Sequence, residues 1–218
     1  MKKPILLTAA LLILTTWVGQ AAGAASAPSV EELFTALKNA NPGLTDYQSD
    51  IHIDLHVNYL VAIPLDLHGK YYYKRPDHYK LVLEHAPQFV QKYPQIFGWN
   101  LPKLEDFNSR IVGQENVDGL PCWHVFLTPR HEMGDLQGQE LWIDRQAAVF
   151  PRQIVHYRDA GQILIEVKYT TKDQYHLFDT MKAAFSFPKI HLTATADASY
   201  SNYLANQKLP DAFFKSGP

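Results

Sequence analysis

The chain has 218 residues, of which 46% are hydrophobic and 19% are charged, and its formal net charge is −2. This composition excludes an intrinsically disordered chain, a collagen-like repeat and a polytopic membrane protein, and the length fits one or two domains. The negative balance argues against nucleic-acid binding, because that binding depends on positive charge facing the phosphates.

The start of the chain has the three regions of a secretory signal peptide. A basic start precedes an apolar run from Ile5 to Val18, and a stretch of small residues follows it. We expect cleavage after Ala24, because the run is shorter than the roughly 20 apolar residues that span a bilayer; a retained anchor is the alternative. Loss of residues 1–24 removes two lysines and no acidic residue, so the net charge becomes −4. The sequence predicts a signal peptide over 1–24 and one soluble domain over 25–218.

The domain opens with one helix and continues in strands. Ser29 and Glu32 have the spacing of a capping box, and apolar residues then recur at helical spacing up to a stop at Asn41-Pro42-Gly43. From Asp46 onward apolar and polar residues alternate with a period of two, which is typical of antiparallel strands with one buried and one solvated face. We expect strands at 51–57, 65–75, 79–84, 109–114, 122–128, 140–144, 149–157, 162–170 and within 190–206.

Motifs that would carry catalysis or a metal are not found. The sequence has no Gly-x-Ser-x-Gly elbow, no His-Glu-x-x-His, no Cys-x-x-Cys and no phosphate-binding loop. His52 and His56 would lie ~13 Å apart on one strand face, too far to share an ion. Cys122 and His124 share a face, and we interpret Cys122 as buried and inert, with an enzyme using this pair as an alternative. Carboxylates such as Asp46 are expected on the solvated face. We therefore predict no metal, cofactor or catalytic residue.

Apolar and aromatic residues exceed what one helix can cover. The chain has 27 Phe, Tyr and Trp residues, and many lie on inward strand faces or in an aromatic insertion at 86–108. Such residues fill cores in any case, but a curved sheet that helices cover incompletely would leave an apolar pocket suited to acyl chains. The predicted lining residues are Leu65, Leu67, Tyr71, Tyr73, Tyr79, Leu81, Leu83, Ile163, Ile165 and Val167.

Several motifs together resemble a known family. Gly69-Lys70-Tyr71-Tyr72-Tyr73-Lys74-Arg75-Pro76 is a strand that opens with glycine and ends in Lys-Arg-Pro, and it follows a signal peptide, an amphipathic helix and a strand. In this order the chain is similar to the LolA-like superfamily of periplasmic lipoprotein carriers and related lipid-binding proteins, over most of residues 29–214. The later motifs that contribute are Asp118-Gly119-Leu120-Pro121-Cys122-Trp123, Leu141-Trp142-Ile143-Asp144, Phe150-Pro151-Arg152 and Asn206-Gln207-Lys208-Leu209-Pro210-Asp211-Ala212-Phe213-Phe214.

The resemblance implies an α+β, mainly β fold, in which a curved antiparallel sheet forms an unclosed half-barrel wrapped over a few helices. Arg75 matches the arginine that, in the carriers, hydrogen-bonds to a helical lid in the closed, empty state; the alternative is a strand-end arginine that reaches solvent. The chain departs from the carriers after its third strand, where residues 85–107 replace an Asp-Gly hairpin and a tryptophan-bearing strand. The lid would then comprise Phe89, Tyr93, Ile96, Phe97 and Trp99.

The function that the resemblance implies is that of an exported, non-enzymatic, monomeric carrier in the periplasm. Its partners would be the acyl chains of a lipoprotein or lipid, together with inner- or outer-membrane proteins. The alternative is a periplasmic sensor or regulatory module of the same fold, which binds a lipidated or peptide signal and acts on a membrane partner.

Overall fold

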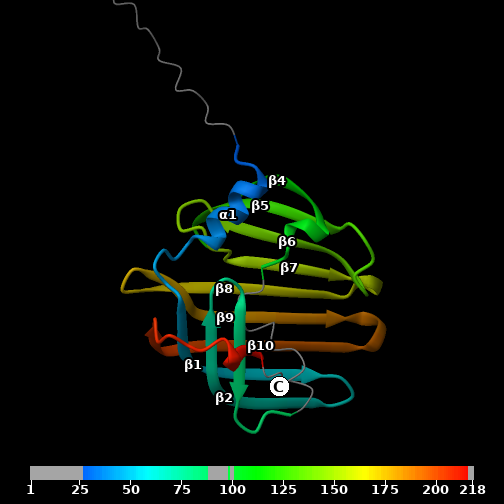
Figure 1. Ribbon diagram of the computed structural model, residues 1–218. Coiled ribbons are helices and arrows are strands. Elements are labelled where there is room, and N and C mark those ends of the chain that lie inside the picture. The colour runs from blue at the N-terminus through cyan, green and yellow to red at the C-terminus, as the bar shows by residue number, and fades with distance from the viewer. Residues whose placement is uncertain (1–26, 88–97, 99–100, 216–218) are drawn as a thin grey trace, which may run out of the picture.

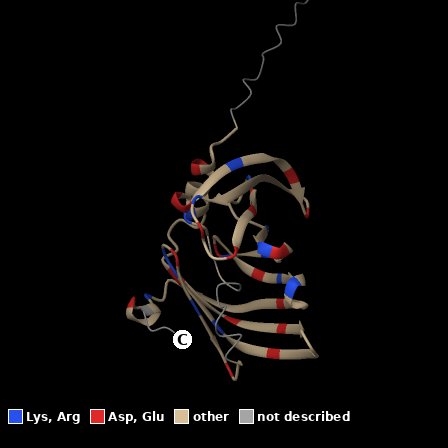
Figure 2. Cartoon of the chain, turned by 90° about the vertical axis from the view of Figure 1, so that its right-hand side faces the viewer, with Lys and Arg blue, Asp and Glu red and all other residues tan. Residues whose placement is uncertain are grey.

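A computed structural model describes residues 27–87, 98 and 101–215 of the chain. Ten antiparallel strands form one curved sheet that does not close, and Figure 2 shows its curvature from the side. The strand order is β3-β2-β1-β10-β9-β8-β7-β6-β5-β4, so β4 to β10 follow the chain and β1 pairs with β10 (Figure 1). The curved, mainly β half-barrel expected from the sequence is confirmed.

The elements are as follows. The strands are β1 Asp46–Asn58, β2 Ala62–Lys74, β3 His78–Leu83, β4 Phe107–Val117, β5 Leu120–Pro129, β6 Leu136–Asp144, β7 Arg152–Tyr157, β8 Gln162–Lys172, β9 Tyr175–Phe187 and β10 Leu192–Ala205. The helices are α1 Val30–Lys38 and α3 Ala212–Lys215, and the 3-10 turns are η2 Leu104–Asp106, η3 Arg158–Ala160 and η4 Pro188–Ile190.

Helix α1 begins at the predicted capping box. The backbone N–H of Glu32 donates to the Ser29 hydroxyl over 3.1 Å, and the N–H of Ser29 donates to the Glu32 carboxylate over 2.7 Å. The apolar stripe of the helix packs on the inward faces of β4 to β6, so α1 covers that end of the sheet. The buried residues of this cluster are Val30, Leu33, Phe34, Leu37, Phe107, Val125, Leu127, Leu141, Ile143 and Phe150.

A second core cluster joins β1 and β2 to β8, β9 and β10. Its centre is Tyr71, which is fully buried and whose ring centroid lies 5.9 Å from that of Phe178 and 5.8 Å from that of Tyr200. Aromatic pairs at these separations add to the free energy gained from burial. Neither of the two described helices covers the inward faces of β7 to β10.

Two strand-level expectations were wrong. Strand β9 was not predicted. The pairing of β8 with β9 shifts register between Lys168 and Tyr169, and the adjacent Leu177 and Phe178 are both buried. This irregularity breaks the alternation of apolar and polar residues that predicts a strand. Asp46 is buried, although it lies on the outward face, because the C-terminal segment covers it: its carboxylate accepts the backbone N–H groups of Gln207 and Lys208.

Some predicted features fall outside the described residues. These are the signal peptide over 1–24 and the lid residues Phe89, Tyr93, Ile96, Phe97 and Trp99. Among the residues that are described, no helix has both the length and the apolar character needed to cross a membrane.

Candidate functional site

A cavity of about 1020 Å³ lies against the inward faces of β7 to β10. Its volume is at the upper end of the roughly 300–1,000 Å³ that is usual for small-molecule sites. The residues that line it are Leu55, Val57, Gly98, Met133, Asp135, Leu136, Gln139, Phe150, Gln153, Val155, Tyr157, Arg158, Asp159, Gly161, Ile163, Ile165, Val167, Met181, Phe185, Phe187, Lys189, Ile190, Leu192 and Ala194.

The alternation of the strands makes the cavity wall apolar. On β8, Ile163, Ile165 and Val167 point inward, while the residues between them point to the other face of the sheet. Two glutamines interrupt the wall, and the Gln153 amide donates to the Gln139 carbonyl over 3.0 Å. One hydrogen bond of this pair is therefore made within the protein.

One end of the cavity is charged. The register pairs Phe187 with Leu192 and His156 with Gln162, so the turns after β7 and β9 lie at the same end of the sheet. There the Lys189 ammonium lies 2.6 Å from the Asp159 carboxylate, and both side chains are exposed. Arg158 also lines this end of the cavity. An apolar interior with an ionic rim matches the two parts of an amphiphile.

Exposed apolar residues lie near the same end. Val57 lines the cavity, and the hairpin turn that follows it carries Tyr59, Leu60 and Val61, which are 56%, 86% and 66% exposed. Ile190, in the turn before β10, lines the cavity and is 51% exposed. Apolar side chains that gather at the surface indicate contact with another molecule or a membrane.

All ten predicted lining residues belong to or pack against the core cluster around Tyr71. Three of them, Ile163, Ile165 and Val167, also line the cavity. The other seven are on β2 and β3 and are not among the residues that line it: Leu65, Leu67, Tyr71, Tyr73, Tyr79, Leu81 and Leu83. Sequence reasoning missed the wall that β9 and β10 contribute, for which the alternation of Met181, Ala183 and Phe185 was the available signal.

Arg75 binds the end of helix α1. Its Nη1 donates to the backbone carbonyl of Lys38 over 3.1 Å, and its Nη2 donates to the carbonyl of Asn41. Its Nε is buried and has no hydrogen-bond partner among the described residues. An adjoining cavity of about 30 Å³, lined in part by Arg75 and Tyr73, has room for a water molecule there. Arg75 is half-buried, and its two hydrogen bonds join the end of β2 to the end of α1.

Gly98 is the described residue of the aromatic insertion that reaches the cavity. It lines the cavity, and a Cβ built on it would lie 2.9 Å from Cδ2 of Tyr79 and 3.4 Å from Cε2 of Tyr71. At this point, the insertion therefore lies directly on the aromatic residues of β2 and β3.

Cys122 and His124 lie on the outward face of β5, away from the cavity. Burial, with a contribution from the Asp144 carboxylate, raises the pKa of the Cys122 thiol to about 11. The two ring nitrogens of His124 lie 2.8 Å and 2.7 Å from carboxylate oxygens of Glu115 and Glu140. This arrangement stabilises the thiol over the thiolate, which is the nucleophilic form of cysteine.

The comparisons with known proteins rest on structure. No protein-family model and no curated protein sequence matches the chain. It is similar to a DUF1329 family protein from Desulfovibrio piger, with a TM-score of 0.63 and 14% identity over 84% of this chain and 95% of that one. An outer membrane lipoprotein-sorting protein domain from Vibrio parahaemolyticus gives 0.62 and 12% over 84% and 95%. A LolA superfamily protein from Nitrosomonas europaea gives 0.55 and 9% over 87% and 99%. The chain therefore has a LolA-like fold.

Proposed function

We propose that this protein is an exported, non-enzymatic carrier that holds acyl chains of a lipoprotein or lipid and shields them from water in the periplasm. The observation that carries the proposal is the apolar cavity of about 1020 Å³ with charged groups at one end. The signal-peptide pattern over residues 1–24 supports export.

The energetics favour an acyl ligand. Burying a methylene group contributes about 0.8 kcal/mol, and Ile165, Met181 and Phe185 provide an apolar surface on which a chain of methylenes can lie. One hydrogen bond of the glutamine pair on the wall is already made within the protein, so the wall's contribution to binding lies mainly in its apolar surface.

The rim supports an amphiphilic ligand and a membrane contact. Arg158 and Lys189 are positioned to face an anionic head group, and in the structure they pair with Glu132 and Asp159. The exposed apolar turn around Leu60 lies near the same end. A ligand could then pass between membrane and cavity with its acyl chains close to apolar groups throughout.

The outward face supports the non-enzymatic part of the proposal. Cys122 is buried and its pKa is raised, and the imidazole of His124 is engaged by two carboxylates. The chain's one cysteine is thus held in the unreactive form.

Native mass spectrometry of the protein, purified from the cells that produce it, tests the proposal. We expect masses above that of the protein alone, with lipid released on activation in the gas phase. Uptake of a fluorescent fatty acid by the delipidated protein, and competition by unlabelled fatty acid, give the second measurement. A protein mass without adducts, together with no uptake of the fluorescent fatty acid, would contradict the proposal.

A further inference from the structure

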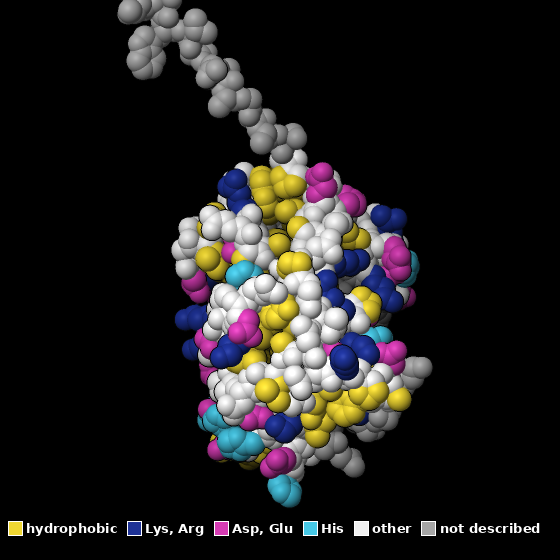
Figure 3. All heavy atoms as spheres, turned by 60° about the vertical axis from the view of Figure 1, so that its left-hand side comes forward, with side chains coloured by type: hydrophobic (Ala, Val, Ile, Leu, Met, Phe, Trp, Pro, Cys, Tyr) yellow, Lys and Arg dark blue, Asp and Glu magenta, His cyan; other side chains and the backbone are white. Residues whose placement is uncertain are grey.

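Two histidines and two aspartates meet on the outward face of the sheet. On β1 and β2 the buried residues Ile53 and Leu67 point inward, so their neighbours in the sequence point outward. The register places His52 directly opposite His68, and Asp54 directly opposite Asp66. Figure 3 shows histidine and acidic side chains side by side at the lower end of the molecule, where Figure 1 places β1 and β2.

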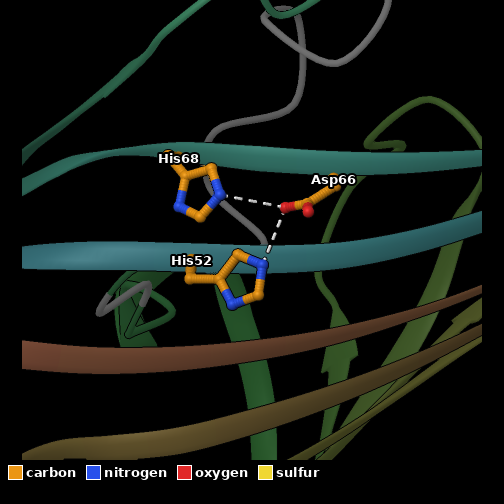
Figure 4. Close-up of side chains that lie close together, drawn as sticks. All are labelled: His52, Asp66 and His68. Atoms are coloured by element: carbon orange, nitrogen blue, oxygen red, sulfur yellow. Dashed lines mark hydrogen bonds and ion pairs between the residues drawn. The ribbon is translucent and has the colours of Figure 1, made fainter.

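The ligand atoms of three of these residues converge. Oδ1 of Asp66 lies 2.7 Å from Nε2 of His52 and 3.1 Å from Nε2 of His68 (Figure 4). All three atoms lie within 4.8 Å of one another. The fourth residue is close, because Oδ1 of Asp54 lies 3.7 Å from Nε2 of His52. The two imidazole rings stack with their centroids 4.4 Å apart and their planes inclined by 7°, and both Nε2 atoms face the Asp66 carboxylate.

The charges around this group favour a cation. Like charges that lie directly opposite on neighbouring strands destabilise the pairing, and Asp54 faces Asp66 on one side and Asp197 of β10 on the other. The nearby lysines have other partners: Lys70 lies 2.6 Å from Asp50, and Lys182 lies 3.4 Å from Asp197. A cation bound among the two histidines and the first two aspartates would remove the repulsion.

We propose that His52, His68 and Asp66, with Asp54 as the fourth ligand, bind one divalent transition-metal ion of the Zn²⁺ or Cu²⁺ class. Two imidazoles and two carboxylates are a donor set that suits these ions, whereas Mg²⁺ and Ca²⁺ prefer sites made wholly of oxygen. A tetrahedral Zn²⁺ ion with bonds of about 2.0–2.2 Å holds its ligand atoms roughly 3.3 Å apart. The separations of 2.7 and 3.1 Å from Asp66 to the two histidines lie close to that value. The Asp54 carboxylate, 3.7 Å from His52 but outside the group of three that converges, would turn toward the ion.

The position of the site allows binding without rearrangement of the core. The side chains of His52, Asp54, Asp66 and His68 are 38%, 56%, 67% and 62% exposed, so an ion reaches them from solvent and their rotamers can adjust. The backbone that carries them is held in the sheet on both sides of β1. The ion would join β1 to β2 on the face opposite the cavity wall, so the inference is independent of the proposed carrier function.

Isothermal titration of the chelator-treated protein, prepared without a polyhistidine tag, with ZnCl₂ tests the inference. We expect one tight site per chain, and at least about tenfold weaker binding in the double variant His52→Gln, His68→Gln. His56→Gln is the matched control, because His56 lies on the same face of β1 but opposite Pro64, and it should bind as the unchanged protein does. Zn²⁺ at a hundredfold excess over Kd should also raise Tm by roughly 5–10 °C, and the double variant should lose that shift.

Co²⁺ provides a readout of the ligands themselves. Tetrahedral coordination gives intense visible absorption, which we expect for the unchanged protein and for His56→Gln but not for the double variant. Circular dichroism should be the same in all three proteins, since the substituted side chains are on the surface. Equal Zn²⁺ affinity in the double variant and the unchanged protein, or no binding by the unchanged protein, would overturn the inference.

Discussion

The guanidinium of Arg75, at the end of β2, donates a hydrogen bond to the backbone carbonyl of Lys38, the last residue of α1. The bond joins the two halves of the core, because α1 packs in the cluster on β4 to β6 and β2 in the cluster around Tyr71. The carbonyls at the C-terminal end of a helix carry partial negative charge, so a cation there is stabilising. Arg75 is therefore placed to control how firmly α1 is attached to the rest of the sheet.

Replacement of Arg75 by leucine should loosen that attachment. We expect the free energy of unfolding to fall by roughly 1–3 kcal/mol, and bound fluorescent fatty acid to dissociate severalfold faster, as measured by stopped-flow fluorescence. Arg130→Leu is the control, because Arg130 also donates to a backbone carbonyl, that of Phe107, but away from the end of α1. Equal dissociation rates for Arg75→Leu and the unchanged protein would reject a latch at this position.

Reducing the cavity should reduce ligand uptake. Ala194 lines the cavity from β10, so Ala194→Phe places a ring in the space that an acyl chain would occupy. We expect at least about tenfold weaker binding of fluorescent fatty acid, which corresponds to about 1.4 kcal/mol. Thr195→Phe adds the same ring to the next residue of β10, on the exposed face, and should leave binding unchanged. Unaltered affinity in Ala194→Phe would place the ligand elsewhere.

Gly69 is required by the close approach of β2 and β3. A Cβ built at this position would lie 2.1 Å from the carbonyl oxygen of Val82 and 2.9 Å from Cα of Leu83. Both contacts are with backbone, so Gly69→Ala forces the two strands apart, and we expect urea denaturation to show a loss of more than about 3 kcal/mol. At Gly113 a Cβ meets nothing within 4 Å. Gly113→Ala should therefore change stability by less than about 1 kcal/mol, and a similar loss in both variants would contradict this explanation.

The thiol of Cys122 should be unreactive in the folded protein. With its pKa raised to about 11 by burial, roughly one molecule in a thousand carries a thiolate at pH 8. We expect the reaction with a disulfide reagent at pH 8 to be at least about 100-fold slower than in 8 M urea, where the thiol is exposed and its pKa returns to the ordinary value near 8.5. Raising the pH toward 11 should speed the reaction of the folded protein. Rapid labelling at pH 8 without denaturant would contradict this prediction and support the alternative in which Cys122 is an activated nucleophile.

The parts of the fold that depend on local pattern could be read from the sequence. The Ser29 cap is a contact over three residues, and the inward face of Ile163, Ile165 and Val167 follows from alternation within one strand. The same alternation puts Arg75 on the side of Tyr71 and Tyr73, and its two carbonyl partners lie on that side. Each of these features is determined by residues close together in the chain.

Features that depend on pairing between distant segments could not be read in this way. Alternation along each strand puts His52 and His68 on an outward face, but their meeting depends on a register that the sequence pattern does not specify. Asp46 has outward parity and is nevertheless buried, because residues 206–208 return over it from the other end of the chain. The extra buried residue in β9 shows a third limit of prediction from sequence. A bulge there changes which residues of the strand point inward, so strict alternation no longer identifies the buried face.

The pairing of β1 with β10 has a consequence for how the molecule is made. The Asn202 amide on β10 donates to the Asp50 carboxylate on β1 across 152 positions of the chain, whereas β4 to β10 can pair one after another through short hairpins. Contacts between distant segments carry a larger entropic cost of loop closure and form slowly. Until β10 is in place, β1 has no mate on one side, and its open edge is available to other strands. Assembly of the full sheet, in whichever compartment the chain folds, therefore awaits β10.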